Sequence, residues 1–136
     1  MGMFASLGVS ASGMDVYQTW IHAISDNVAN VNTIRPTDED AFQRKMVVAE
    51  STGGEGAHSV GTGARVSTIR LGDENGRLIT DPTHPLADEN GQVRAPDMDL
   101  ETEMTHLIVA QRSYQANVTV FERARDSYQR ALEIGR

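Results

Sequence analysis

Two long segments of the chain repeat apolar side chains at steps of three and four residues. In the first segment these positions are Phe4, Leu7, Ala11, Met14, Tyr17, Ile21, Ile24, Val28 and Val31. An α-helix has 3.6 residues per turn, so this spacing gathers the apolar side chains on one side of a helix. The pattern predicts an N-terminal helix of about seven turns.

The other faces of this predicted helix carry almost no charge. Between Met1 and Asn32 the formally charged side chains are Asp15 and Asp26 alone. A helix face that stays in water normally carries Lys and Glu, which favour helix and solubility. The composition therefore indicates that this helix packs on more than one side in its working state.

The C-terminal segment has the longer periodic pattern. Its seam alternates steps of four and three, as in a heptad repeat: Leu100, Met104, Leu107, Gln111, Tyr114, Val118, Phe121, Arg125, Tyr128 and Leu132. Asp97 and Asp99 can cap the first turn of this helix, and Gly135 marks its end. The segment predicts a helix of roughly 50 Å. Gln111 and Arg125 interrupt the seam with polar groups of the kind that set register or partner choice.

The segment between the two helices is rich in Gly, Pro, Asp and Glu. Short alternating runs predict strands at residues 42–48, 64–71 and 76–80. The sequence "DENG" occurs twice, at 73–76 and 88–91, and each Asn-Gly pair predicts a tight hairpin turn. Residues 51–63 contain too few apolar side chains to pack and are expected to form a mobile loop.

These patterns predict a mainly α fold with a small β insertion. The long N- and C-terminal helices pair as a coiled coil, and a short β-hairpin domain lies between them in the sequence. The expected division is an N-terminal helix at 1–34, a β-rich insertion at 35–96 and a C-terminal helix at 97–136.

Composition excludes several classes of function. The 136-residue chain has a net charge of -7, so a nucleic-acid backbone or an anionic membrane surface would repel it. It has no cysteine, which excludes disulfides and thiolate chemistry. No apolar run approaches the ~20 residues of a membrane-spanning helix. No basic segment precedes an apolar one near the N-terminus, so export is expected to proceed without a Sec-type signal peptide.

Catalytic and metal-binding motifs are absent from the sequence. The four histidines share no ligand spacing, and the "DENG" turns lack the Glu that a calcium loop needs at its twelfth position, where His84 and Asp99 stand. No phosphate-binding loop and no Gly-x-Ser-x-Gly elbow occurs. We expect no enzyme activity and no cofactor. A hydrolase acting on peptidoglycan is the remaining enzyme class, but no base, nucleophile or metal site supports it.

Two motifs at opposite ends of the chain resemble one protein family. "DNVANVNT" (26–33) is similar to the Asn-rich signature near the N-terminus of flagellar axial proteins, the rod and hook group. Residues 101–136, with the run "AQRSYQAN" and the ending "ALEIG", are similar to the C-terminal helix of the same proteins. Residues 41–48 and 81–99 carry a narrower resemblance, to a short proximal rod protein of that family.

The resemblance implies a structural subunit of the proximal rod of the bacterial flagellar basal body, which transmits torque across the periplasm. It implies export without a cleaved signal peptide and self-association in a helical array. The implied partners are the rod proteins FlgB, FlgF and FlgG, the basal-body protein FliE and the membrane ring, with no cofactor. Residues 34–43 replace the Gly-Tyr step of many hook and distal-rod proteins, which favours the proximal rod. The alternative function is a stand-alone coiled-coil adaptor.

The seams and the two family motifs together predict the residues that pack against other subunits. In the first helix they are Leu7, Met14, Ile21, Ile24, Asn27, Val28, Asn30 and Asn32. In the second they are Met104, Leu107, Gln111, Tyr114, Asn117, Val118, Phe121, Tyr128 and Leu132. Asn30 and Asn32 are expected to bind carbonyls at the helix end, and Asn27 to reach a neighbouring chain. Asp26 either pairs with a basic residue of a neighbour or stays in water.

Overall fold

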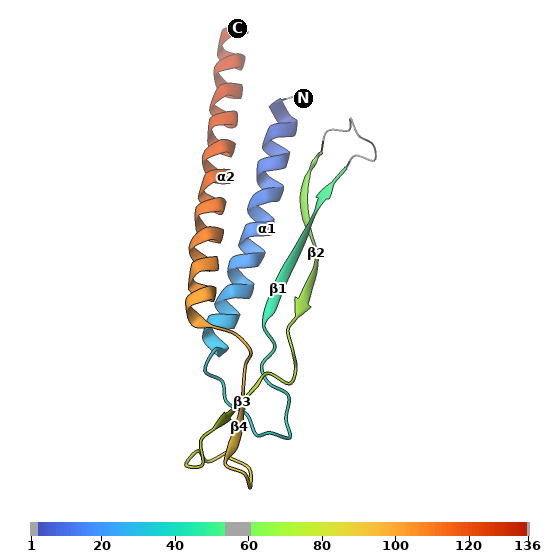
Figure 1. Cartoon of the computed structure of the whole chain (residues 1–136). Helices are drawn as coiled ribbons and strands as arrows, with labels where there is room; N and C mark the ends of the chain where they lie inside the picture. Colours follow the sequence, from blue (N-terminus) through green and yellow to red (C-terminus); the bar gives the residue numbers. More distant parts are fainter. Residues whose placement is uncertain (1–2, 54–60, 136) are drawn as a thin grey trace. The chain divides into compact units, whose positions relative to one another are not determined.

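The computed structural model describes residues 3–53 and 61–135 of the chain. Its elements follow in the order α1 (Met3–Asn30), β1 (Lys45–Thr52), β2 (Gly63–Leu71), β3 (Arg77–Thr80), β4 (Gln92–Ala95) and α2 (Leu100–Ile134) (Figure 1). β1 pairs with β2 and β3 pairs with β4, in two separate two-stranded sheets. The predicted fold class, mainly α with a small β insertion, is confirmed.

The chain forms two compact units, and α1, β1, β2 and α2 each run from one unit into the other. Unit 1 consists of Met1–Ile21, Val47–Thr68 and Ile108–Arg136. Unit 2 consists of His22–Met46 and Ile69–Leu107.

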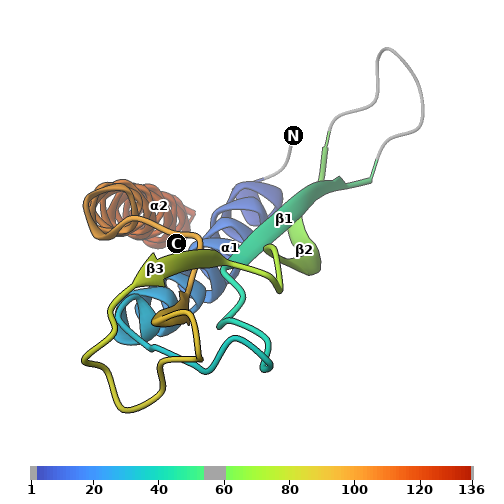
Figure 2. The ribbon, with the colours of Figure 1, turned by 60° about the horizontal axis from the view of Figure 1, so that its bottom comes forward.

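In unit 1, α1 lies between α2 and the ribbon of β1 and β2 (Figures 1 and 2). The ring of Phe4 meets the ring of Tyr128 edge to face, with centroids 4.9 Å apart. Ser12 of α1 accepts a 3.0 Å hydrogen bond at its Oγ from the backbone N–H of Ala64. These contacts fasten α1 to a helix on one side and to a strand on the other.

Unit 2 holds the main core of the described residues. β3 and β4 pair antiparallel, from Arg77 opposite Ala95 to Thr80 opposite Gln92. On the other edge of β4, Arg35 and Arg94 exchange two backbone hydrogen bonds of 2.9 Å. The apolar side chains of this core are fully or almost fully buried: Ala23, Ile24, Val31, Ala41, Val93, Ala95 and Met98.

The ends of α2 follow the sequence prediction. The Asp99 carboxylate accepts a 2.9 Å hydrogen bond from the backbone N–H of Thr102 and another from its hydroxyl, which is an N-cap arrangement. These two bonds lower the pKa of Asp99, the backbone bond contributing most. At the other end the N–H of Gly135 donates to the carbonyl of Ala131.

The three predicted strands form, but each begins at a different residue than expected. β1 begins at Lys45, three residues later than expected, and continues to Thr52, while β2 begins at Gly63. The ends of the predicted 51–63 loop therefore belong to strands, and residues 54–60 lie outside the described residues. β4 was not predicted at all. Its alternation of half-buried and buried residues is only four residues long, too short to stand out in the sequence.

The two-residue hairpin turns predicted at "DENG" are wrong. In each turn the aspartate side chain, Asp73 or Asp88, accepts the N–H of the asparagine two residues later. Only the glycines have positive φ, +56° at Gly76 and +71° at Gly91. The first turn joins strands of different sheets, and the second ends a longer loop before β4. The local aspartate hydrogen bond stabilises an Asx turn in place of the tight turn that Asn-Gly favours.

The second of these turns also holds a neighbouring loop. Asp88 accepts hydrogen bonds from the N–H of Gln92, 2.8 Å away, and from the hydroxyl of Thr37, 3.1 Å away. Hydrogen bonding to the carboxylate, chiefly by the N–H of Gln92, lowers the pKa of Asp88. Arg94 fastens the same loop by donating to the carbonyl of Thr37.

Candidate functional site

The N-terminal residues predicted to pack against other subunits differ in burial. Ile24 and Asn27 are buried within unit 2. Asn32 is exposed. The others are half-buried: Leu7, Met14, Ile21, Val28 and Asn30. The half-buried side chains leave surface that a neighbouring subunit can cover, whereas Ile24 and Asn27 already contact their own chain.

The side-chain oxygen of Asn27 and both of its amide protons form hydrogen bonds within the same chain. Its Oδ1 accepts the backbone N–H of Lys45 at 2.8 Å, and its Nδ2 donates to the carbonyl of the same residue at 3.0 Å. The second Nδ2 proton goes to Glu103 Oε2, 2.9 Å away. The side-chain amide thus pairs with the backbone at the start of β1 as a neighbouring strand would.

Glu103 is the buried charge at this point, and both it and Asn27 are only 1% exposed. Its Oε1 accepts a 2.5 Å hydrogen bond from Arg44 Nε, an ion pair. Arg44 Nη2 lies 3.1 Å from His106 Nδ1. We call Asn27, Arg44, Glu103 and His106 the Glu103 cluster. Sequence patterns missed it, because Glu103 looks like an ordinary acid in the first turn of a helix.

The residues beside Asn27 end α1. Asn30 Nδ2 donates to the carbonyl of Asp26 at 2.9 Å, as expected for a residue that satisfies a terminal carbonyl. No non-glycine residue in 3–53 or 61–135 has positive φ, so the left-handed cap that asparagine permits is not formed. Asp26 pairs with Lys45 of the same chain, 2.7 Å away and exposed to solvent.

The face that α2 turns inward lies beside the predicted seam. One predicted line of the seam is half-buried: Leu107, Tyr114, Phe121 and Tyr128. The second inward line contains Glu103, Ala110 and Asn117, each seven residues after the last, and Ala110 is fully buried. Asn117 packs against Gly13 of α1. Of the other predicted residues, Val118 is half-buried, whereas Met104, Gln111 and Leu132 are exposed.

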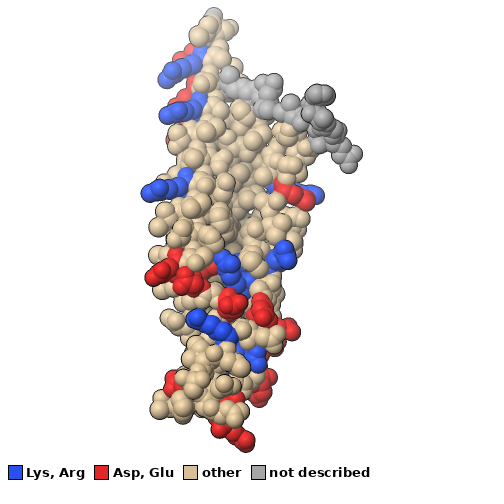
Figure 3. All heavy atoms as spheres, viewed as in Figure 1, with Lys and Arg blue, Asp and Glu red and all other residues tan. Residues whose placement is uncertain are grey.

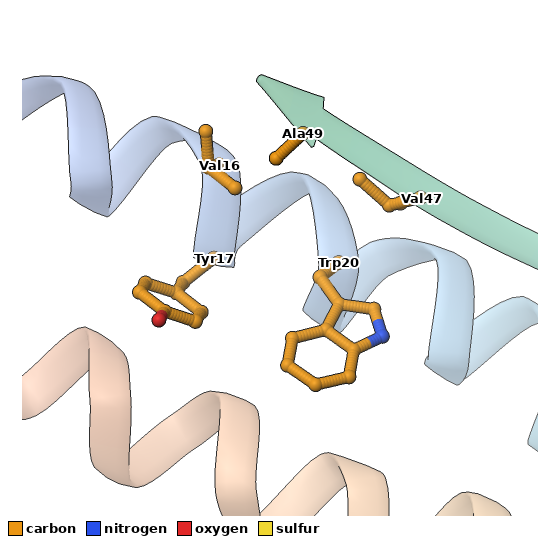
Figure 4. Close-up of a pocket in the computed structure, with 5 residues that line it drawn as sticks. All are labelled: Val16, Tyr17, Trp20, Val47 and Ala49. Carbon is orange, nitrogen blue, oxygen red and sulfur yellow. The ribbon is translucent and has the colours of Figure 1, made fainter. Parts of the chain in front are cut away.

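A pocket of about 230 Å³ in unit 1 is lined by residues of α1 and β1 (Figure 4). Its lining is mostly apolar and consists of Val16, Tyr17, Trp20, Val47 and Ala49. The rings of Tyr17 and Trp20 point to the same side of α1, with centroids 6.2 Å apart. Aliphatic and aromatic side chains of this kind suit an apolar contact.

Charge is divided unevenly between the two units. Unit 2 contains thirteen of the nineteen acidic side chains and six of the twelve basic ones, which gives it the whole net charge of -7. Unit 1 has six of each and is neutral. On the face in Figure 3 the spheres over α1 are almost all uncoloured, and charged groups gather on unit 2 and along α2. The predicted uncharged surface of α1 is therefore visible in the structure.

Within residues 3–53 and 61–135, no group of three or more His, Cys, Asp or Glu side chains could hold a metal ion. Among the helices described, neither is long and apolar enough to cross a membrane.

Comparison with known proteins identifies the family. The chain is 35% identical to the flagellar basal-body rod protein FlgC of Bacillus subtilis (strain 168), over 100% of both chains. It is 31% identical to the FlgC of Borreliella burgdorferi, over 98% of each. The chain belongs to the FlgC family of flagellar basal-body rod proteins. The narrower resemblance drawn from residues 41–48 and 81–99 is thereby confirmed.

Two further comparisons agree with the FlgC family. The FlgC of Agrobacterium fabrum is 32% identical over 96% of this chain and 93% of its own. Residues 89–134, which contain the whole of α2, match the family described as flagellar basal body rod FlgEFG protein C-terminal. The FlgC family is a structural protein family and not an enzyme family.

Proposed function

We propose that this chain is a structural subunit of the proximal rod of the flagellar basal body, where it transmits torque across the periplasm. The observation that carries the proposal is the 35% identity to a basal-body rod protein over the full length of both chains. Export without a cleaved signal peptide is part of the same proposal.

The surface of unit 1 supports assembly with other subunits. Large apolar side chains are exposed on α2 at Ile108, Val109 and Val120, and the α1 surface carries almost no charge. Exposed apolar and uncharged surface of this kind favours contact between proteins. The partners that we propose are further copies of this chain and the axial proteins FlgB, FlgF, FlgG and FliE, with the membrane ring nearby.

The test replaces an exposed apolar side chain of unit 1. Val120 is 51% exposed, so Val120→Asp should change the stability of the purified chain by less than about 0.5 kcal/mol. In cells that carry it as the only copy, we expect loss of rods from purified basal bodies and loss of swimming. The matched control is Leu86→Asp, an equivalent change at an exposed site in a loop of unit 2, which should leave rods intact.

Deletion of the gene gives the sharper outcome. Cells without the chain should have no rod and no filament. If they swim normally, the rod proposal is wrong. A stable monomer whose helices are uniformly protected from hydrogen exchange, in cells that swim without it, would support the coiled-coil adaptor.

A further inference from the structure

Three segments of unit 2 meet at one buried carboxylate. Asn27 comes from the end of α1, Arg44 from the residues before β1, and Glu103 from the first turns of α2. We infer that the Glu103 cluster is a conformational lock that closes all three segments together. Every contact lies within one chain, so the inference does not depend on the rod proposal.

The burial of Glu103 makes the closure cooperative. A carboxylate can leave water only where hydrogen bonds and an opposite charge replace its hydration. Here one oxygen depends on Asn27 and the other on Arg44. If the segment of Asn27 or the segment of Arg44 moves away, one oxygen of the buried Glu103 carboxylate loses its hydrogen bond. The N-terminal end of α2 is then no longer held in place.

The side-chain amide of Asn27 joins the end of α1 to the start of β1 and to the first turns of α2. It uses its oxygen and one proton on the backbone of Lys45, and its remaining proton on Glu103. An aspartate in this position has no proton to donate and would place a second negative charge against Glu103. Alanine would leave the Lys45 backbone and Glu103 without these partners. The chemistry of the position therefore selects an amide of this length.

The neighbouring ion pair supplies a matched control. Asp26 is the residue before Asn27, and its carboxylate binds Lys45 Nζ at 2.7 Å in an exposed position. It touches one of the same segments but is solvated and does not contact Glu103. Exposed pairs of this kind contribute little to stability.

The experiment measures amide hydrogen exchange of the purified full chain by mass spectrometry. Asn27→Ala should speed exchange tenfold or more in residues 100–107, although α2 begins far from Asn27 in the sequence. Asp26→Ala should leave the exchange of residues 100–107 unchanged. The double variant Asn27→Ala with Glu103→Gln should exchange no faster than about the faster single variant, because both changes open the same lock.

Two outcomes overturn the inference: faster exchange confined to the end of α1 in Asn27→Ala, or effects of the two changes that multiply in the double variant. If a variant fails to fold, hydrogen exchange of the unaltered chain in urea still tests the inference. Under increasing urea, segments 22–30, 44–46 and 100–107 should open with one common urea dependence. Separate opening of any one of these segments rejects the lock.

Discussion

Unit 2 buries ten of its described side chains almost completely, whereas two of the described side chains of unit 1, Ser10 and Ala110, are buried to that degree. Both units contain parts of the same two helices. In unit 2 the helices pack together with β4 and with the loops that precede β1 and α2, which closes a small core. In unit 1 the described rings and large aliphatic side chains of α1 and α2 are half-buried or exposed.

This difference separates two sources of order in one chain. Burying a large apolar side chain contributes about 1.5–3 kcal/mol, so the buried core stabilises unit 2. Unit 1 gains less, because its apolar surface is only partly removed from water. Partners that cover unit 1 would complete it, which fits the proposed assembly into a rod.

The largest effect is expected from the core of unit 2. Ile24 is almost fully buried, so Ile24→Ala should lower the free energy of unfolding by about 2–5 kcal/mol. The comparison variant is Val120→Ala in unit 1, which should cost less than about 0.5 kcal/mol. Urea unfolding followed by circular dichroism measures both. Equal losses in the two variants would remove the distinction between the units.

A pair of glycines tests the same comparison through the backbone. Gly76 in unit 2 has φ +56°, and an added Cβ would overlap the carbonyl oxygen of Ala95 and the Cβ of Ala41. Gly76→Ala should therefore destabilise the chain by about 1–3 kcal/mol, measured by urea unfolding.

The matched substitution in unit 1 should act in the opposite direction. Nothing lies within 4 Å of a Cβ added to Gly8, which is inside α1. Gly8→Ala should stabilise the helix by up to about 1 kcal/mol, because alanine has the higher helix propensity. A loss of stability from Gly8→Ala would mean that unit 1 is packed as tightly as unit 2.

The smallest effect concerns the cap of α2. The pKa of Asp99 is lowered from its ordinary value of 3.8, so its hydrogen bonds to Thr102 stabilise the fold fully above that value. The contribution is lost as the pH falls through the lowered pKa. An NMR titration from about pH 5 to about pH 2 should move the Thr102 amide resonance and loosen the first turn. Asp99→Asn keeps a hydrogen-bond acceptor but has no carboxylate to protonate, so the Thr102 amide resonance of this variant should not move over the same pH range. If the resonance moves equally in the variant, protonation of Asp99 is not its cause.

Much of the fold could be predicted from periodicity. Both helices, the Asp99 cap, the Gly135 end and three of the four strands follow from local patterns that one segment contains by itself. The inward face of α2 could not be predicted in this way. Met104 and Leu132 are more apolar than Ala110, yet Ala110 is fully buried and the other two are exposed. Small residues let helices approach closely, as at Gly13 and Asn117, and a hydrophobic pattern does not record this.

The Glu103 cluster shows a second limit. Asn27 was predicted to reach a neighbouring chain, and the structure binds it to Lys45 and Glu103 of its own. The partners lie 18 and 76 positions away in the sequence. No local pattern pairs such distant residues, so the burial of Glu103 could not be predicted. Whether the half-buried residues of α1 and α2 contact other subunits stays a prediction.

The division of charge has a consequence for arrays of this chain. Electrostatic self-repulsion rises with the square of the net charge that is brought within a Debye length, about 8 Å at physiological salt. Because unit 1 is neutral, its copies can crowd together without accumulating this energy. Unit 2 adds -7 with each copy. In the array that we propose, unit 2 would therefore set the closest spacing between copies, and this spacing should widen as salt is removed.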